Sequence, residues 1–513
     1  MTSETPPSLY AAREPVFPRR VSGLFRRLKW WIMIVTLGIY YLTPWIRWDR
    51  GVSLPDQAVL IDLANRRFYF FWIEIWPHEF YFVGGLLVMA GLGLFLFTSA
   101  LGRVWCGYTC PQTVWTDLFI LVERWIEGDR NARVRLYHAK WDLRKWRLQL
   151  TKWIAWLLIS IATGGAWVFY FTDAPTLAQD LITFSAPAVA YITIAILTLT
   201  TFVFGGFMRE QVCIYMCPWP RIQSAMMDPD TLTVGYREWR GEPRGKGNLR
   251  RQNAAKAAAA EAITSAAGPG EAKYKATPYP GLKDPTATSL VTDGPGDCID
   301  CMACVNVCPM GIDIRDGQQM ECITCALCID ACDDVMEKIG KPRGLIDYLA
   351  LSDAEAERSG AAPKSIWKHI LRARTILYTT LWSLVGVGLL YALFIRSDIE
   401  LTVSAVRNPT YVVQSDSSVR NIYDVRLRNK LGDDRTFHLS LTSEETLLIE
   451  LEGRETLDVP IPADTTLLQR VYVTARPQDP AASTDVSDLR LWVEDKESGD
   501  RASRPTTFNG KAN

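Results

Sequence analysis

The chain of 513 residues contains only four histidines, His78, His138, His369 and His438. None lies in an apolar run long enough to cross a membrane, so a membrane haem b held by two helix histidines is not expected. The sequence also lacks a G-x-G-x-x-G and a P-loop motif, and therefore gives no sign of nicotinamide, flavin or nucleotide binding. Its 56 basic and 56 acidic residues cancel, whereas general nucleic-acid binders are usually markedly basic.

Cysteine is absent before Cys106 and after Cys332. The 12 cysteines between these positions never occur singly, but in pairs or groups of four: 106/110, 213/217, 298/301/304/308 and 322/325/328/332. Such grouping is typical of metal and cluster sites and not of a disulfide scaffold.

Eight of the cysteines follow the spacing of bacterial two-cluster ferredoxins. The first run reads C-x2-C-x2-C-x3-C-P, and the second repeats it with Asp333 in place of the proline. In such proteins the fourth cysteine of each run serves the other cluster. We therefore predict two [4Fe–4S] clusters, which would pass electrons. The predicted ligands are Cys298, Cys301, Cys304 and Cys332 for cluster one, and Cys322, Cys325, Cys328 and Cys308 for cluster two.

Five apolar segments are long enough to cross a hydrocarbon core of about 30 Å. Tryptophans at their ends are typical of interfacial anchors. A shorter apolar segment, 68–76, contains Glu74, and we expect it to be interfacial or partly buried. The predicted spans are residues 28–46, 80–100, 153–171, 186–207 and 375–395.

Basic residues gather before the first span, between the second and third, and before the fifth, while the loop between the third and fourth has no Lys or Arg. The positive-inside rule then predicts a cytoplasmic N-terminus, five crossings and an outer C-terminus. All cysteines would face the cytoplasm, where thiols stay reduced. We expect a multi-pass protein of the bacterial inner membrane, in contact with lipid.

The remaining cysteines form two copies of a C-x-Y-x-C-P motif, Cys106/Cys110 after the second span and Cys213/Cys217 after the fourth. This pattern suggests duplication of a two-helix unit, which would bring both motifs together at the same depth. Cysteines four apart should share one helix face, and the following proline should break the helix. Soft thiolates favour Cu(I), zinc or iron–sulfur iron. We favour a copper site over zinc or a further cluster, and both over simple apolar packing.

Beyond residue 396 short alternating strands replace the helices, as in an immunoglobulin-like sandwich. The fold class is therefore a multi-domain membrane protein, with a five-helix transmembrane bundle, a cytoplasmic α+β ferredoxin-like insert and a periplasmic all-β domain. The expected order is a tail (1–27), four spans with both C-x-x-x-C-P motifs (28–220), a linker (221–295), the ferredoxin domain (296–345), a second linker (346–374), the fifth span (375–396) and the sandwich (397–513).

This combination of motifs resembles the cytochrome c oxidase accessory proteins called CcoG, FixG or RdxA, over nearly the whole chain. The ferredoxin spacing alone is common, but its pairing with Cys106/Cys110 and Cys213/Cys217 is much more specific. The resemblance implies a cupric reductase that converts Cu(II) to Cu(I) for assembly of cbb3-type oxidase. It also implies that the eight ferredoxin cysteines carry electrons, that the other four bind copper, and that oxidase subunits or assembly factors are partners.

Two other functions remain open at the level of sequence. One is a general electron-transfer subunit that links a quinol pool to a redox partner. The other is a non-enzymatic assembly scaffold. The sequence names neither the electron donor nor the oligomeric state, and a homodimer is compatible with it.

Overall fold

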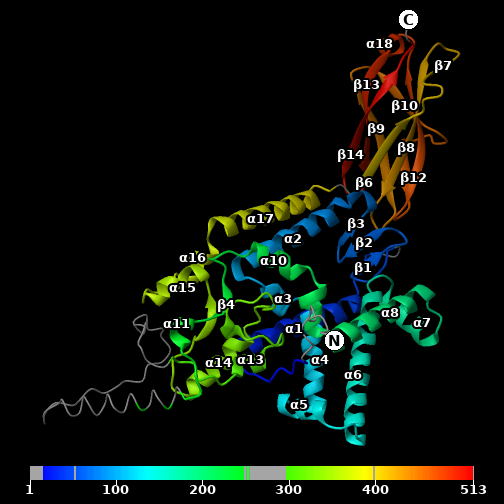
Figure 1. The fold of residues 1–513 in the computed structure, drawn as a ribbon. Coiled ribbons are helices and arrows are strands. Elements are labelled where there is room, and N and C mark those ends of the chain that lie inside the picture. Colours follow the sequence, from blue (N-terminus) through cyan, green and yellow to red (C-terminus); the bar gives the residue numbers. More distant parts are fainter. Residues whose placement is uncertain are drawn as a thin grey trace, which may run out of the picture. The chain divides into compact units, whose positions relative to one another are not determined.

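The computed structural model describes residues 15–50, 54–247, 250, 254, 296–396 and 399–511. The predicted tail before residue 15 and the part of the predicted linker at 255–295 lie outside these residues. The chain forms two compact units (Figure 1). The first comprises Met1–Pro44 and Pro77–Gly386, and the second comprises Trp45–Trp76 and Val387–Asn513.

Within the described residues, three helices of the first unit are long and apolar enough to cross a membrane. They are α2 (Tyr81–Leu101), α8 (Ala188–Thr201) with its π-helical continuation η3 (Phe202–Phe207), and α17 (Ala373–Phe394). Helices α2 and α17 run side by side, with Gly93 facing Trp382 and Gly386 facing Met89 (Figure 1).

The two other predicted spans are also helical, as α1 (Leu24–Leu42) and α6 (Leu143–Val168). Both begin with basic residues, including Arg26 and Lys29 in α1 and Lys145 and Lys152 in α6. These charges shorten the apolar part of each helix. By length and composition, three of the five expected spans therefore qualify as membrane-crossing helices within the described residues.

Shorter helices connect these long ones. A break after α2 leads to α3 (Val104–Tyr108), α4 (Pro111–Glu127) and α5 (Arg130–His138). Helix α7 (Ala174–Thr183) joins α6 to α8. After η3 come α9 (Arg209–Gln211), the π-helical turn η4 (Val212–Met216) and α10 (Trp219–Met226). The chain thus follows the α2 and η3 segments with a short helix, a proline and a further helix in each case.

The ferredoxin part contains α13 (Ala303–Val307) and α14 (Leu327–Lys338). Helix α13 stops before Cys308-Pro309, whereas α14 continues through Cys332 because Asp333 replaces the helix-breaking proline. Strand β4 (Thr233–Tyr236), before the cysteine runs, pairs with β5 (Ile346–Leu349), after them. Both strands lie in segments predicted as linkers, and together they close the ferredoxin part into one body with the helices.

Helix α1 is joined to α14 at its N-terminus. The first turn of a helix has unpaired N–H groups, which an acidic side chain can accept. Here the carboxylate of Asp330 accepts from the backbone N–H of Phe25 at 3.3 Å and of Arg26 at 2.7 Å. A Cβ atom on Gly23 would lie 2.2 Å from Asp330 Cγ, so this close approach requires glycine. The cap therefore fixes the ferredoxin part against α1.

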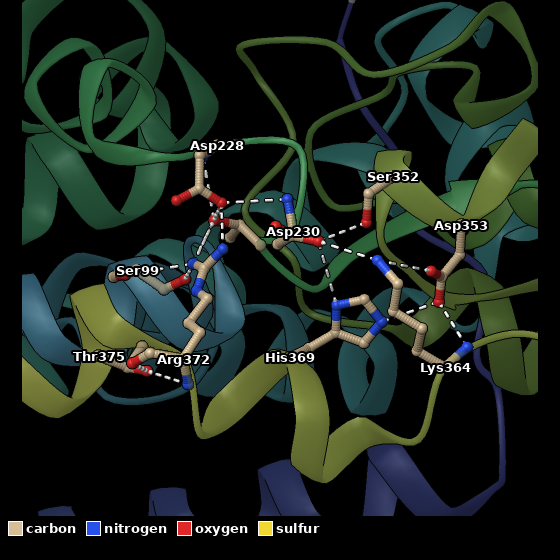
Figure 2. A network of polar contacts seen from close by, with 10 residues as sticks. Ser99, Asp228, Asp230, Ser352, Asp353, Lys364, His369, Arg372 and Thr375 are labelled. Atoms are coloured by element: carbon tan, nitrogen blue, oxygen red, sulfur yellow. Dashed lines mark hydrogen bonds and ion pairs between the residues drawn. The ribbon is translucent and has the colours of Figure 1, made fainter.

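A second polar network joins the segment after α10 to the start of α17 (Figure 2). Asp228 binds Arg372 and, at 3.0 Å, Arg374. The buried imidazole of His369, in α16 (Ile366–Ile370), lies 2.8 Å from Asp353 at the start of α15 (Leu351–Arg358). These contacts hold α15, α16 and the first turn of α17 on the rest of the unit.

The second unit contains the immunoglobulin-like sandwich. One antiparallel sheet has the order β10-β12-β8-β6, with β7 beside β8, and the other has the order β11-β9-β13-β14. Alternate residues of the long central strands, such as Tyr423, Val425 and Leu427, are fully buried. The strands are β6 (Ile399–Ala405), β7 (Val412–Val413), β8 (Val419–Asn429), β9 (Arg435–Ser443), β10 (Leu447–Leu451), β11 (Asp458–Ile461), β12 (Thr466–Ala475), β13 (Val486–Asp495) and β14 (Arg501–Asn509).

The segment between α1 and α2 belongs to this same unit. It forms a small antiparallel sheet of β1 (Val59–Asp62), β2 (Arg67–Phe70) and β3 (Ile73–Ile75). The guanidinium of Arg67 binds Asp464 of the sandwich and also Glu74 of β3. The short apolar segment 68–76 is therefore mainly strand, with Tyr69 and Trp76 each 2% exposed.

Candidate iron–sulfur sites and the adjoining cysteine pairs

Two small apolar hollows lie side by side in the ferredoxin part, and cysteines line both. Cys298, Cys301, Cys304 and Cys332 line the first. Cys308, Cys322, Cys325 and Cys328 line the second, and Cys304 also reaches it. These are the two ligand sets expected from the crossed pattern. Four thiols around each hollow fit the ligand requirement of a [4Fe–4S] cluster.

The backbone of the two cysteine loops supports the same assignment. Asp300 and Met302 in the first loop, and Thr324 and Ala326 in the second, have positive φ values of 53° to 60°. Such values are uncommon for residues other than glycine and indicate a constrained backbone. Left-handed residues between right-handed ones turn successive N–H groups to one side, which forms the kind of concavity that binds iron–sulfur clusters. The constrained backbone of the two loops therefore lies where the clusters would bind.

Several residues that line the two hollows are not part of the cysteine motifs. Val234 of β4 lines the second hollow, and Tyr236 and Ile346 line the first. The first hollow also contains Arg315, which is 6% exposed and pairs with Asp300 at 2.7 Å and Asp313 at 2.6 Å. The residues of β4 and β5 reach the hollows by long-range contacts, so no local pattern could have identified them.

Burial raises the pKa of the thiols around the hollows. It brings the pKa of Cys304 to about 11, that of Cys308 to about 12 and that of Cys322 to about 11. Burial also raises the pKa of Cys328 well above its ordinary value, and neighbouring cysteines add to the effect. Cluster binding must therefore displace protons from these cysteines.

The two cysteines of each pair do not share one helix face, so that expectation is wrong. Cys106 is within α3, but Cys110 has extended backbone and immediately precedes Pro111, the first residue of α4. Cys213 lies in the π-helical turn η4, and Cys217 is extended before Pro218. The predicted helix breaks are present. They occur at the second cysteine of each pair, where the proline ring limits the preceding residue.

The two motifs do come together, as the duplication predicts. Cys106 and Cys213 belong to one apolar cluster, which also contains Cys325, Cys308 and Ile323. The thiol of Cys106 donates to Gln223 Oε1 at 3.1 Å. Burial raises the pKa of Cys106 to about 12 and that of Cys213 to about 11, and Cys110 and Cys217 add to the effect.

Gly107 brings the first motif directly against the second cysteine loop of the ferredoxin part. A Cβ atom at this position would lie 2.6 Å from Ile323 O and 3.0 Å from Cys325 Cα. The next residue, Tyr108, donates its hydroxyl to Cys325 O at 3.1 Å. The first cysteine motif is therefore in direct contact with the second cysteine loop of the ferredoxin part.

The four paired thiols do not form a ready coordination shell. In the part of the chain that the structure describes, no three His, Cys, Asp or Glu side chains converge closely enough to hold a single metal ion. A metal bound by these thiols would require the side chains to rotate toward it.

Comparison with protein families assigns most of the chain. A family described as "4Fe-4S dicluster domain" matches residues 208–275 and 268–351, and one described as "4Fe-4S binding domain" matches residues 82–129. Residues 389–511 match a family described as "IG-like fold at C-terminal of FixG", a description that also names an oxidoreductase. The predicted sandwich and the iron–sulfur character of the ferredoxin part are confirmed by these matches.

Three similar proteins cover nearly the full length of the chain. Protein RdxB of Cereibacter sphaeroides is 64% identical over 99% of this chain and 98% of its own length. Protein RdxA of the same organism is 56% identical over 98% of each chain. Nitrogen fixation protein FixG of Rhizobium meliloti is 50% identical over 98% of this chain and 94% of its own length.

Proposed function

The chain belongs to the FixG/RdxA family of iron–sulfur redox proteins, and from this premise we propose that it is a membrane-bound cupric reductase. Its product, Cu(I), would serve copper delivery and assembly of a cbb3-type cytochrome c oxidase. The observation that carries the proposal is the contact of Gly107 with the Ile323–Cys325 backbone. It puts a set of thiols suited to Cu(I) against an iron–sulfur site.

The chain's own residues have distinct roles in this scheme. The eight ferredoxin cysteines would hold two clusters, which supply electrons one at a time when bound. Apolar residues such as Ile312, Ile323 and Ile346 line the hollows and keep water out. Cys106, Cys110, Cys213 and Cys217 would bind copper. Because soft thiolates prefer Cu(I) to Cu(II), this ligand set favours the reduced product.

The proposal includes a topology of five crossings, with α1 and α6 as the less apolar spans. The basic starts of α1 and α6 would lie at the cytoplasmic surface, together with all the cysteines. The sandwich would then lie in the periplasm, where it could contact oxidase subunits or assembly factors.

The test replaces all four paired cysteines by serine in the full-length protein loaded with its clusters. Dithionite supplies the electrons, and a Cu(I)-specific chelator reports the product. We expect loss of cupric reduction with unchanged visible absorbance of the clusters. Asp334→Ala, on the exposed face of α14, is the matched control. Persistent Cu(I) formation in the four-serine variant would disprove the copper site.

A third cluster at the paired cysteines is the second candidate, because residues 82–129 match a 4Fe-4S binding family yet contain only Cys106 and Cys110. A cluster there would need Cys213 and Cys217 as well, and the protein would then be a general electron-transfer subunit. Iron analysis separates the two functions. Two clusters require eight iron atoms per chain and three require twelve, and only the third cluster would be lost in the four-serine variant.

A further inference from the structure

A large cavity lies between α4, α5, α6 and the end of η3, and it is separate from the two cluster hollows. Its volume is about 710 Å³, which is within the range of small-molecule and cofactor sites. Aromatic side chains form much of its wall, among them Tyr137, Trp141, Trp153 and Trp156. Phe207, the last residue of an apolar helix long enough to span a membrane, also lines it. A flat, largely apolar molecule fits such walls.

Three of the four cations in the wall are paired with carboxylates. Lys152 binds Glu127 at 2.7 Å, and Arg209 and Arg133 both bind Glu123. Burial acts to raise the pKa of Glu123, but these two guanidinium groups outweigh it and hold the pKa below its ordinary value. Lys145 donates to the carbonyl oxygens of Tyr137 and Ala139. A strongly anionic ligand therefore finds little free positive charge.

Two buried side chains nevertheless keep unused hydrogen-bond donors at this cavity. Arg133 is 3% exposed and Trp156 is 2% exposed, and both line the wall. Within the described residues, Nη1 of Arg133 and Nε1 of Trp156 have no hydrogen-bond partner. A buried donor without a partner is unfavourable, so a ligand oxygen that accepts from either side chain would be stabilised.

The cavity also lies next to a smaller hollow that one of the paired cysteines lines. Arg209 and Glu210 form part of its wall and, at the same time, part of the wall of a smaller hollow. That smaller hollow contains Cys213, Pro309, Met310 and Ile323. A ligand in the large cavity is thus one layer of side chains from both the paired cysteines and the second cluster loop.

From these contacts we propose that the cavity binds the ring of a membrane quinol, which is the electron donor. This inference rests on the proposed function and supplies its missing reductant. Aromatic walls match the ring, and Arg133 and Trp156, two wall residues with unused donors, would donate to its oxygens. Oxidation of one quinol to the quinone releases two electrons and two protons. The electrons reduce two iron–sulfur centres by one each, and then two Cu(II) ions to Cu(I). The protons leave to water past the exposed imidazole of His138.

The first experiment locates the ligand with a short-chain azidoquinone, photolysed on the full-length protein and mapped by mass spectrometry. We expect labelled peptides from 137–156 and 206–210, with labelling competed by decylubiquinone. Labelling elsewhere, or labelling that decylubiquinone does not reduce, would overturn the proposal. So would native mass spectrometry that finds an anionic phospholipid in place of the quinone, not displaced by it.

The second experiment follows rapid reduction of the clusters by decylubiquinol. Trp156→Phe keeps the ring and removes one donor, and should slow reduction roughly three- to tenfold. Gln149→Trp should fill the cavity and abolish quinol-driven reduction. Arg147→Gln, an exposed change on the same helix outside the cavity, is the control and should react normally.

Dithionite must reduce the clusters equally in all three variants, which shows that they are folded and loaded. Unchanged quinol rates in both cavity variants, or cluster potentials too far below the quinol couple for transfer, would overturn the quinol site. Failure of dithionite-driven cupric reduction would instead refute the proposed function, and would leave the quinone labelling result intact.

Discussion

At the scale of single residues, Gly107 determines how closely the first cysteine pair approaches the second cysteine loop of the ferredoxin part. Any Cβ atom there must push against the backbone of Ile323 and Cys325, which cannot move aside like a flexible side chain. Glycine is required by this close approach and not by an unusual backbone angle. A search for ligand residues would not identify Gly107, although this residue sets the distance between the first cysteine pair and the second cysteine loop.

We predict that Gly107→Ala separates the paired cysteines from the second cluster loop and slows cupric reduction severalfold. The cluster absorbance should stay unchanged, because no ligand is altered. Single-turnover reduction of Cu(II) by the pre-reduced protein measures the effect. Gly38→Ala is the control, since a Cβ atom at Gly38 meets nothing within 4 Å. Equal rates for both variants would show that the contact does not limit electron transfer.

At the scale of elements, the long-range cap between α14 and α1 joins the ferredoxin part to the helices. Its acceptor, Asp330, lies between the ligand positions Cys328 and Cys332. Asp117 of α4 adds a buried ion pair with Arg26 at 2.9 Å. Burial acts to raise the pKa of Asp117, but Lys29 and Arg26 outweigh it and lower that pKa. The start of α1 is therefore held from two sides by carboxylates of other elements.

We predict that Asp330→Ala weakens the first turn of α1 by about 0.5–2 kcal/mol, the usual cost of a lost N-terminal cap. Hydrogen exchange of the amides of Phe25 and Arg26 should accelerate, by about tenfold if the loss is 1.4 kcal/mol. Gly23→Ala should give the same pattern by pushing the carboxylate away. Asp334→Ala removes an exposed carboxylate from the same helix and should leave this exchange unchanged. Unaltered exchange in Asp330→Ala would exclude the capping role.

The elements show what the sequence could predict and what it could not. The cysteine runs and the alternating strands, such as β8, carry local patterns, and both were anticipated. The β4–β5 pair joins Tyr236 to Ile346 across the whole cysteine region, and no local pattern marks it. The paired cysteines were placed on one helix face because their spacing is four, but Pro111 and Pro218 break the chain at the second cysteine. Five spans were expected from apolar runs, yet the basic first turns of α1 and α6 weaken two of them.

At the scale of the whole molecule, two segments that are far apart in the sequence form the second unit. The small sheet β1–β3 precedes α2, and the sandwich follows α17, yet the two belong to one compact unit. Arg67 links them through Asp464, and Arg428 of the sandwich stacks over Trp76 at 4.4 Å. The loop between the first two helices is thus part of the second unit's structure.

We predict that this unit loses stability as the pH rises. Burial raises the pKa of Glu74 from 4.5 to about 7, although Arg67 opposes the shift. Between these values the folded state holds a proton that the unfolded state has lost, so stability falls with increasing pH. The loss should reach about 3 kcal/mol at most by pH 8. Hydrogen exchange of the β2–β3 amides between pH 5 and 8, corrected for intrinsic rates, measures it.

The substitution Glu74→Gln should flatten this dependence, because the amide does not titrate. Glu444→Gln, at an exposed site of the same unit, should keep it. A wild-type protein with equal protection at pH 5 and pH 8 would contradict the prediction.

The cap on α1 has a consequence for the order in which the protein matures. The amide of Arg26 and the carboxylate that accepts from it are 304 residues apart. Helix α1 leaves the ribosome long before Asp330 is synthesised. The cap on its first turn therefore cannot form until the chain as far as α14 has been made. Since Asp330 lies between two cluster ligands, its position is set in the segment that also wraps the metal. The cap on the first helix is therefore completed late, together with the folding of the segment that carries the second cysteine run.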